Sequence, residues 1–269
     1  MDKRPVVFLD SGIGGIPYCR EFAARNPGES VVYLADRRNF PYGGRSRGEL
    51  LDILGALVPD LVSREDPKLV VLACNTASVS ALSFLRERFP RLPFVGTVPA
   101  VKPALLGTKT GRIGVLGTDR TVRDPYIAEL AAAYGAGSQV IPIAAPELVD
   151  FVEYRYALAG EEERRRVLIP YLERLRAAGA DGLVLGCTHF LFLLEEFRRE
   201  AAPDITVYES VEGITRRIES LLDEGGLRSA GLPFRRFYVR LSGGPEGDAP
   251  FPGPWESLAR SLGFELEIL

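Results

Sequence analysis

Short apolar runs alternate with amphipathic segments along most of this 269-residue chain, and small polar residues directly follow several of the runs. Continuous apolar runs are typical of strands that are buried on both faces, whereas apolar residues at helical spacing are typical of amphipathic helices. Alternation of the two with short loops predicts an open α/β fold with parallel sheets. The predicted strands are residues 6–9, 30–35, 69–73, 93–97, 113–116, 139–143, 182–185, 234–241 and 264–269.

Helix signals lie between these runs. Ser46 and Glu49 form a predicted capping box that opens a helix with leucines at helical spacing. Residues 161–178 are predicted to form one long helix, with acids in its first turn, arginines in its last and Gly179 after it. Residues 117–121 are predicted to be a loop. The other predicted helices start at Pro17, follow Thr76, end near Tyr134, cover 146–156, end near Asp223 and surround Trp255.

The pattern restarts at Arg112, so the chain reads as two halves. Leu9-Asp10-Ser11 ends a predicted strand in the first half, and Leu116-Gly117-Thr118 holds the same place in the second. Leu72-Ala73-Cys74-Asn75 and Leu185-Gly186-Cys187-Thr188 correspond in the same way. The similar offsets suggest a duplicated α/β unit, although so few matching residues also allow coincidence.

The composition excludes several classes of protein. A net charge of −3 with scattered arginines gives no electrostatic argument for a nucleic-acid partner. No apolar run approaches the ~18 residues that a membrane span requires, so no membrane association is expected. The apolar stretch near the N-terminus is too short for a signal peptide and runs into Asp10. We therefore expect a cytoplasmic protein with a length suited to one large or two ordinary domains.

The cysteine and glycine patterns argue against common prosthetic groups. The three cysteines form no CxxC pair, and with a single histidine they do not supply a structural zinc site. Pro17 occupies the place of the third glycine in a dinucleotide-binding motif, and no GK[ST] phosphate loop occurs. We expect no metal and no nucleotide, flavin or pyridoxal cofactor. Cys19 lies inside a predicted helix without polar neighbours and is expected in the core.

Cys74 and Cys187 differ from Cys19 because each follows a predicted strand and precedes a predicted helix. Ligands of open α/β sheets bind beyond the carboxyl ends of the strands, and a helix N-terminus favours a thiolate. A single cysteine in such a place is more often a buried structural thiol. Two in matching polar loops favour an acid–base pair on opposite walls of one cleft between the halves.

Other polar residues follow the same strands. Asp10 or Ser11 is expected to cap the first helix, which still leaves a carboxylate beside the cleft to orient a cationic group or to tune a thiol. His189 is two residues from Cys187 and is a candidate proton partner, with Glu153 as the acid that orients it. The neutral donors suit substrate carboxylate oxygens as well as ordinary capping: Asn75, Thr76, Thr118, Thr121 and Thr188.

At these residues the chain resembles the cofactor-independent glutamate racemases of the aspartate/glutamate racemase superfamily. The matching motifs are residues 10–15 (DSGIGG), 41–43 (PYG), 73–78 (ACNTAS) and 186–189 (GCTH). They occur in the family's order over residues 10 to about 210. The chain departs from the family at Phe190-Leu191, where the family has tyrosine-proline, and near Glu209-Ser210, where the family usually has an aspartate.

The resemblance implies two α/β domains related by pseudo-twofold symmetry, residues 1–98 with 210–269 and residues 99–209, with the active site in the cleft between them. It implies racemisation of L- and D-glutamate for peptidoglycan synthesis without a cofactor, and a homodimer, since dimers are common in the family. Cys74 would serve the D-enantiomer and Cys187 the L-enantiomer, assisted by Asp10 and by the His189–Glu153 pair. The implied substrate-binding residues are Asp10, Ser11, Pro41, Tyr42, Gly43, Asn75, Thr76, Thr188 and His189, with Thr118 and Thr121 close by.

Three other functions fit some of the same residues. A racemase of aspartate or of a hydantoin would use the same two cysteines on another substrate. A non-catalytic amino-acid-binding protein could keep the pocket but would not need both thiols. A redox protein would form a reversible Cys74–Cys187 disulfide, although the cysteines lack the usual CxxC spacing.

Overall fold

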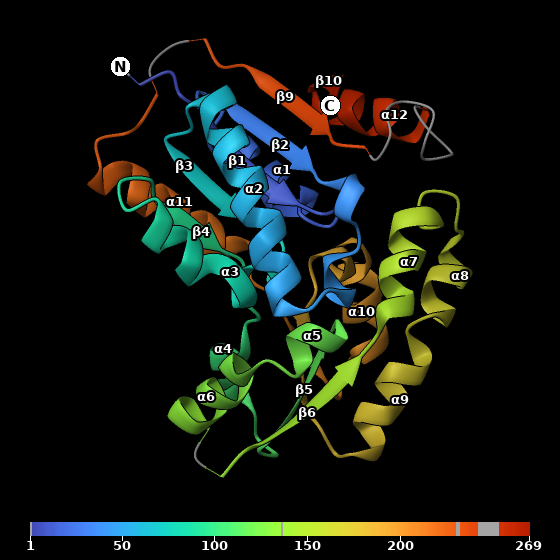
Figure 1. Ribbon diagram of the computed structural model, residues 1–269. Helices are drawn as coiled ribbons and strands as arrows, with labels where there is room; N and C mark the ends of the chain where they lie inside the picture. The colour runs from blue at the N-terminus through green and yellow to red at the C-terminus, as the bar shows by residue number, and fades with distance from the viewer. Residues whose placement is uncertain (1, 136, 230–231, 242–252) are drawn as a thin grey trace. The chain divides into compact units, whose positions relative to one another are not determined.

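The computed structural model describes residues 2–135, 137–229, 232–241 and 253–269 (Figure 1). The chain divides into two compact units, the first formed by Met1–Thr97 with Val211–Leu269 and the second by Val98–Ser210. Each unit contains one parallel sheet, as predicted for an α/β fold. Within the described ranges, no helix combines the length and the apolar character needed to cross a bilayer.

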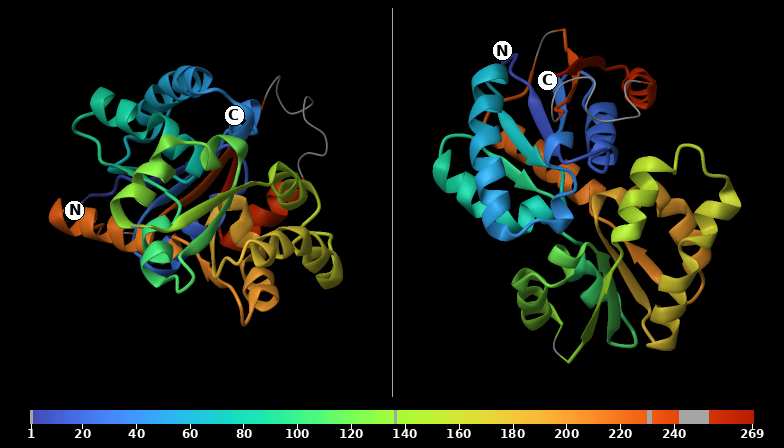
Figure 2. Two further views of the ribbon diagram at one scale, coloured as in Figure 1. Left: turned by 90° about the horizontal axis from the view of Figure 1, so that it is seen from below. Right: turned by 45° about the vertical axis from the view of Figure 1, so that its right-hand side comes forward.

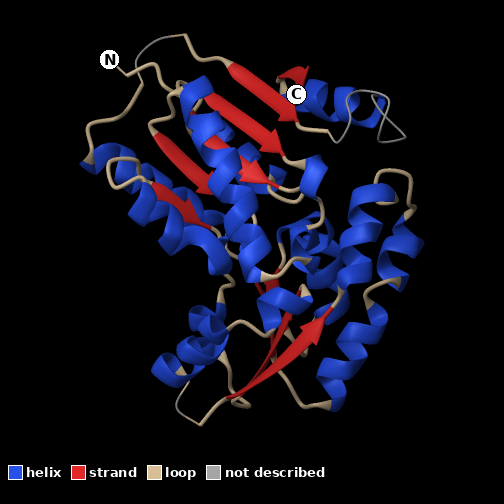
Figure 3. Ribbon diagram, viewed as in Figure 1, coloured by secondary structure: helices blue, strands red, loops and turns tan. Residues whose placement is uncertain are grey.

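The sheet of the first unit has the order β10-β9-β2-β1-β3-β4, and every described pairing in it is parallel (Figure 3). The chain's last two strands therefore extend a sheet that begins at the N-terminus, at the edge next to β2. The strand bounds are β1 Val6–Asp10, β2 Val31–Ala35, β3 Leu69–Leu72, β4 Phe94–Gly96, β9 Arg235–Val239 and β10 Glu265–Ile268.

Helices cover both faces of this sheet, which explains why its central strands β1, β2 and β3 are buried at every position (Figure 2). Alternate residues such as Val7 and Leu9 pack in one core with leucines of α2 and with α3. Phe8 points to the other face, where its ring lies 5.7 Å from that of Phe22 on α1. The helices of this unit are α1 Ile16–Arg25, α2 Arg47–Glu65, α3 Asn75–Arg88, α11 Val211–Glu224 and α12 Gly253–Leu262, with the short 3-10 helices η1 Arg37–Asn39 and η2 Tyr42–Gly44.

The predicted capping box is confirmed at the start of α2. The Ser46 hydroxyl accepts the Glu49 N–H, and the Glu49 carboxylate accepts the Ser46 N–H. Two backbone donors that a helix start leaves without intrahelical partners are satisfied in this way. The position of this helix start was therefore predictable from two residues.

The second unit has the sheet order β6-β5-β7-β8, again with parallel pairings. In both units the order runs second, first, third and fourth strand, counted along the unit's own chain. Cys74 and Cys187 thus each follow the third strand of their unit. The elements are α4 Val101–Gly107, β5 Arg112–Gly117, α5 Asp119–Val122, α6 Pro125–Tyr134, β6 Gln139–Ala144, α7 Pro146–Tyr154, α8 Glu161–Arg166, α9 Ile169–Ala177, β7 Gly182–Gly186, η3 Thr188–Leu193, α10 Leu194–Ala201 and β8 Thr206–Tyr208.

Two predictions about this unit are wrong. The long helix expected over 161–178 is two helices, because Pro170 lies in the first turn of α9. Proline lacks the N–H that an interior helical position donates, whereas the first turn leaves that donor without an intrahelical partner anyway. The loop expected over 117–121 is partly helical, since α5 begins at Asp119 and Pro125 then opens a separate helix, α6.

Candidate active site

Cys74 lies at the carboxyl edge of the first unit's sheet. Strands β1 and β3 pair with Leu9 opposite Leu72, so Asp10-Ser11 and Ala73-Cys74 leave the sheet side by side. Cys74 is extended (φ −138°), 7% exposed, and is the residue that precedes the first turn of the 14-residue helix α3. The positive end of the helix dipole and the N–H groups of the first turn favour a thiolate there.

Asp10 is fully buried next to this position. Its carboxylate accepts hydrogen bonds from the backbone N–H groups of Ser11 and Gly12 and from the Ser11 hydroxyl. Helix α1 begins later, after Gly15, and no side chain caps it. The expectation that Asp10 or Ser11 caps the first helix is therefore wrong, and Asp10 instead places a buried carboxylate in the turn beside Cys74.

Tyr42 of the Pro41-Tyr42-Gly43 motif is buried in the same apolar cluster as Cys74. Its hydroxyl donates a hydrogen bond of 2.8 Å to Asp36. Burial, followed by the charge and hydrogen bond of Asp36 and the nearby charges of Cys74 and Asp10, raises the pKa of Tyr42 well above its usual range. The side chain is therefore a neutral phenol, close to three acidic groups.

Asp36 is a site residue that the sequence reading missed. It is fully buried and directly follows β2, whereas Asp10 is the last residue of β1. A carboxylate at the end of a buried strand was the available signal, and it was used for Asp10 alone. Pro41 is exposed and Gly43 half-buried, so the backbone of this motif is accessible beside the buried phenol.

Asn75 is the buried residue with the most unused hydrogen-bonding capacity in this unit. It is 2% exposed, and neither its Oδ1 nor its Nδ2 has a hydrogen-bond partner among the described residues. Buried polar atoms without partners are rare because they lose their hydration without compensation. An amide in this condition at the start of α3, next to Cys74, suits the binding of a polar ligand. Ser11 and Thr76 are buried beside it.

Cys187 occupies the equivalent place in the second unit. Gly117 of β5 pairs with Gly186 of β7, so Thr118 and Cys187 directly follow neighbouring strands. Cys187 is extended and 6% exposed, but the segment that follows it is the 3-10 helix η3 rather than the predicted α-helix. A 3-10 helix of six residues has poorer hydrogen-bond geometry than an α-helix, so less help from a helix dipole is expected here.

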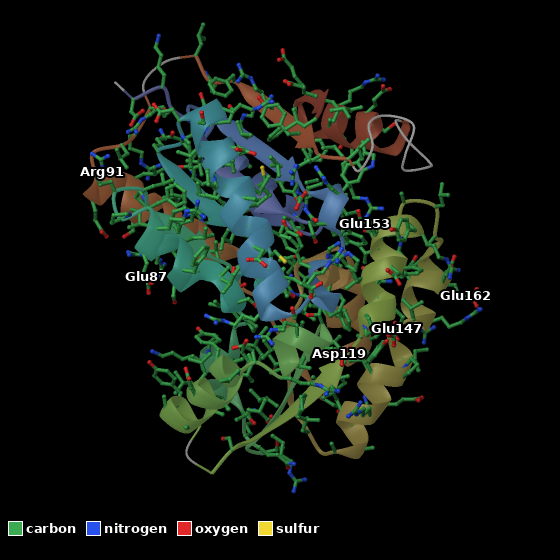
Figure 4. The ribbon with its side chains drawn as sticks, viewed as in Figure 1. Glu87, Arg91, Asp119, Glu147, Glu153 and Glu162 are labelled. Carbon is green, nitrogen blue, oxygen red and sulfur yellow. The ribbon has the colours of Figure 1, made fainter. Side chains whose placement is uncertain are left out.

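His189, rather than a helix dipole, is in a position to favour the thiolate of Cys187. Its Nδ1 lies 3.8 Å from the Cys187 sulfur, and its Nε2 lies 2.9 Å from Oε2 of Glu153. Glu153 is on α7, which packs against η3, and its side chain is 2% exposed (Figure 4). Burial alone would lower the pKa of His189, but hydrogen bonds and charges from Cys187 and Glu153 raise it well above its usual range. The raised pKa favours the imidazolium form of His189 beside the thiol.

The threonines of the second unit lie in two places: Thr118 and Thr121 at the start of α5, and Thr188 directly after Cys187. Thr118 is the N-cap of α5, where its hydroxyl accepts the Thr121 N–H and lies 3.1 Å from the Thr121 hydroxyl. Ordinary capping therefore explains part of their hydrogen bonding. Thr188 is buried between Cys187 and His189 in sequence. Phe190 and Leu191, where the chain departs from the racemase motif, are buried in η3.

Cys19 shows what an unrelated cysteine looks like in this fold. It lies in α1 with 1% exposure, and burial raises the pKa of its thiol far above the usual value. All three cysteines are free thiols. The described residues hold no group of three or more acidic, histidine or cysteine side chains that could bind a metal ion.

Comparisons with known proteins agree on one family. The sequence model of the Asp/Glu/hydantoin racemases matches residues 20–218. A glutamate racemase from Roseiflexus sp. (strain RS-1) is 41% identical over 224 residues, which cover 83% of this chain and 81% of that protein. The structure of Escherichia coli glutamate racemase in complex with L-glutamate and the activator UDP-MurNAc-Ala is similar with a TM-score of 0.82 and 32% identity, covering 99% of this chain and 98% of that one. Francisella tularensis glutamate racemase in complex with D-glutamate is similar with a TM-score of 0.78 and 25% identity, covering 100% and 98%.

Proposed function

This chain belongs to the Asp/Glu/hydantoin racemase family, and from that premise we propose that it is a cofactor-independent glutamate racemase. The observation that carries the proposal is the equivalent placement of two buried thiols. Cys74 lies two residues after β3 and Cys187 directly after β7, each the third strand of a parallel unit whose first four strands have the same order, and each has its own ionisable neighbours.

The reaction needs two bases because it inverts a carbon atom. One thiolate takes the α-proton of glutamate, so the C–H bond breaks and its electron pair stays on the carbon, delocalised into the carboxylate. The opposite thiol then gives its proton to the other face of that carbon. Each turnover leaves the two cysteines with exchanged protonation states. The α-proton is poorly acidic, so the site must also hold the substrate's charges firmly.

The roles of the residues follow the family resemblance. Cys74 takes the proton of D-glutamate and Cys187 that of L-glutamate. Asp10 assists Cys74, while the imidazolium of His189, held by Glu153, stabilises the thiolate of Cys187. The proposed substrate contacts come from Asp10, Ser11, Pro41, Tyr42, Gly43, Asn75, Thr76, Thr118, Thr121, Thr188 and His189. The unpaired amide of Asn75 supports its place in that set.

Glutamate is favoured over aspartate or a hydantoin because the relatives of highest similarity reported above are glutamate racemases. We further propose that the protein works in the cytoplasm, where it supplies D-glutamate for peptidoglycan, and that it forms a homodimer. The last point rests on the family resemblance, and light scattering coupled to size-exclusion chromatography measures it directly.

Solvent deuterium incorporation tests reaction, substrate and two-base logic together. Incubation of the protein with L-glutamate or D-glutamate in D₂O, followed by mass spectrometry, should show deuterium at the α-carbon of the product enantiomer. The same assay with aspartate and with a hydantoin measures the competing substrates. Exchange with aspartate but not with glutamate would move the assignment to an aspartate racemase, and exchange with none of them would favour a binding protein.

A further inference from the structure

A partly buried ion pair links the C-terminal part of the chain to the surroundings of Cys74. Arg240 directly follows β9, and its Nη1 lies 3.3 Å from Oδ1 of the fully buried Asp36. The other carboxylate oxygen accepts the Tyr42 hydroxyl and the Asn39 side-chain amide, both at 2.8 Å. The backbone fixes the arginine in place, because Arg240 N–H donates to the carbonyl of Ala35 at the end of β2.

The phenol at the end of this chain of contacts lies among acidic groups. Tyr42 is buried in the same apolar cluster as Cys74, and its hydroxyl donates its one hydrogen bond to Asp36. A phenol that donates to Asp36 does not donate to a thiolate at Cys74. A negative charge near a thiol disfavours the thiolate, so the state of Asp36 matters to Cys74.

We propose that Arg240, acting through Asp36, is a positioning residue for the Cys74 thiol. The guanidinium neutralises the buried carboxylate, and the carboxylate holds the Tyr42 phenol in one orientation beside Cys74. The Asp36 carboxylate also accepts hydrogen bonds from Asn39 and Tyr42, and loss of Arg240 would remove the cation that faces its other oxygen. The proposal rests on the acid–base role of Cys74 proposed above. It assigns a function to Arg240, which follows β9 and lies outside the racemase motifs.

The same strand carries a matched control. Four residues earlier, Arg236 lies 3.3 Å from Oε2 of Glu65, and the Tyr238 hydroxyl donates to Oε1 of Glu65 at 2.7 Å. This cluster also combines an arginine, a buried carboxylate and a tyrosine. Glu65 ends α2 and precedes the amino end of β3. Cys74 follows the carboxyl end of β3, so the two residues lie at opposite ends of this strand. Loss of Arg236 therefore reproduces the structural cost of a broken ion pair without touching the thiol.

The pH dependence of thiol alkylation measures the effect on Cys74 directly. The intact protein is treated briefly with iodoacetamide over a range of pH, and modification of Cys74 and Cys187 is quantified by mass spectrometry of their separate peptides. Arg240→Met should raise the pH midpoint for Cys74 by about half a unit or more, because a nearby negative charge loses its partner. Asp36→Asn should lower the midpoint, because the negative charge itself is removed.

Arg240→Lys should restore a midpoint close to that of the unmodified sequence, and Arg236→Met should leave it unchanged. Cys187 should keep its midpoint in every variant, which makes it an internal reference. Equal shifts in Arg240→Met and Arg236→Met, shifts of the same sign in Arg240→Met and Asp36→Asn, or no shift in either would overturn the proposal. If Arg240→Met does not fold, as circular dichroism would show, Asp36→Asn and Arg240→Lys still decide. Alkylation requires no turnover, so a failure to racemise glutamate would refute the proposed function and leave this result standing.

Discussion

Cys74 and Cys187 hold the same topological place in two units, yet their ionisable neighbours differ. Cys74 precedes an α-helix of 14 residues and has acidic or neutral neighbours, Asp10 and Tyr42, with Asp36 behind the phenol. Cys187 precedes a six-residue 3-10 helix and has the imidazole of His189 beside it.

The comparison shows two ways to prepare a thiol for proton transfer. At Cys74 the helix N-terminus supplies the positive potential, worth about 0.3–1 kcal/mol at an exposed site and up to ~2 in partly buried ones. At Cys187 the imidazole of His189, hydrogen-bonded to the buried carboxylate of Glu153, is in a position to supply it. We infer that the two thiols respond differently to changes in charge and pH although equivalent steps are proposed for them.

Removal of either thiol should have the largest effect, and it tests whether racemisation needs both cysteines. Cys74→Ala and Cys187→Ala should each reduce racemisation of glutamate by roughly 10³-fold or more, because one face of the α-carbon then has no proton donor or acceptor. Circular dichroism of the substrate solution measures the interconversion. Cys19→Ala is the matched control, a buried cysteine in α1 that should keep its activity. Retention of more than about a tenth of the activity in either single variant would break the two-base reading.

Glu153→Gln tests what is special about the Cys187 side. Loss of the carboxylate removes a charge that raises the pKa of His189, so less imidazolium faces the thiol. We expect a fall in kcat of about 10–100-fold and a shift of the alkylation midpoint of Cys187 to higher pH, with Cys74 unaffected.

Glu147→Gln on the same helix is the control for that experiment. Glu147 is exposed and accepts a hydrogen bond from Tyr171, so its loss changes α7 without reaching His189 (Figure 4). Equal effects of the two substitutions would mean that Glu153 acts only by stabilising the helix. A shift of the Cys74 midpoint in Glu153→Gln would contradict the separate preparation of the two thiols.

Much of the fold was predictable because a strand buried on both faces has no polar positions. Val6–Leu9 and Leu69–Leu72 stand out as continuous apolar runs, and the polar residue that ends each run marks the functional edge of the sheet. Cys74, Asp10 and His189 were found in this way. The break in the predicted 161–178 helix also had a local signal, since Pro170 lacks the N–H of an interior helical position and is favoured in a first turn.

Contacts made by residues far apart in sequence were not predictable. Asp36 and Arg240 are separated by 204 residues, and their pairing depends on β9 joining the edge of a sheet begun by β1 and β2. The choice of a 3-10 helix after Cys187 likewise has no local signature comparable to a proline or a capping box. Periodicity identifies elements and their ends, whereas tertiary packing decides which charges meet across them.

Asn75→Ala probes binding on the Cys74 side. Both polar atoms of this buried amide lack partners among the described residues, so truncation should change the free energy of unfolding by less than about 1 kcal/mol. The KM for glutamate should nevertheless rise about tenfold, since a hydrogen bond to a charged ligand group is lost. Ser80 lies in the same helix and carries a buried hydroxyl that also lacks a partner among the described residues. Ser80→Ala should leave KM unchanged. A large loss of stability with an unchanged KM would assign Asn75 to the fold instead.

The smallest expected effect is a pH dependence of stability that belongs to the Cys187 side alone. The pKa of His189 in the folded protein is raised above its ordinary value of 6.5, so folding favours the imidazolium. The resulting stabilisation is complete below the unfolded pKa and is lost as the pH rises through the folded pKa. Urea unfolding should therefore show that the advantage of the unmodified sequence over His189→Asn shrinks as the pH rises above the ordinary pKa of histidine, on the order of 1 kcal/mol for each unit of the pKa shift. Cys19→Ala, measured in parallel, should differ from the unmodified sequence by a constant amount. An advantage that grows with pH would mean that His189 is buried as a neutral ring, and the thiol of Cys187 would then have no imidazolium beside it.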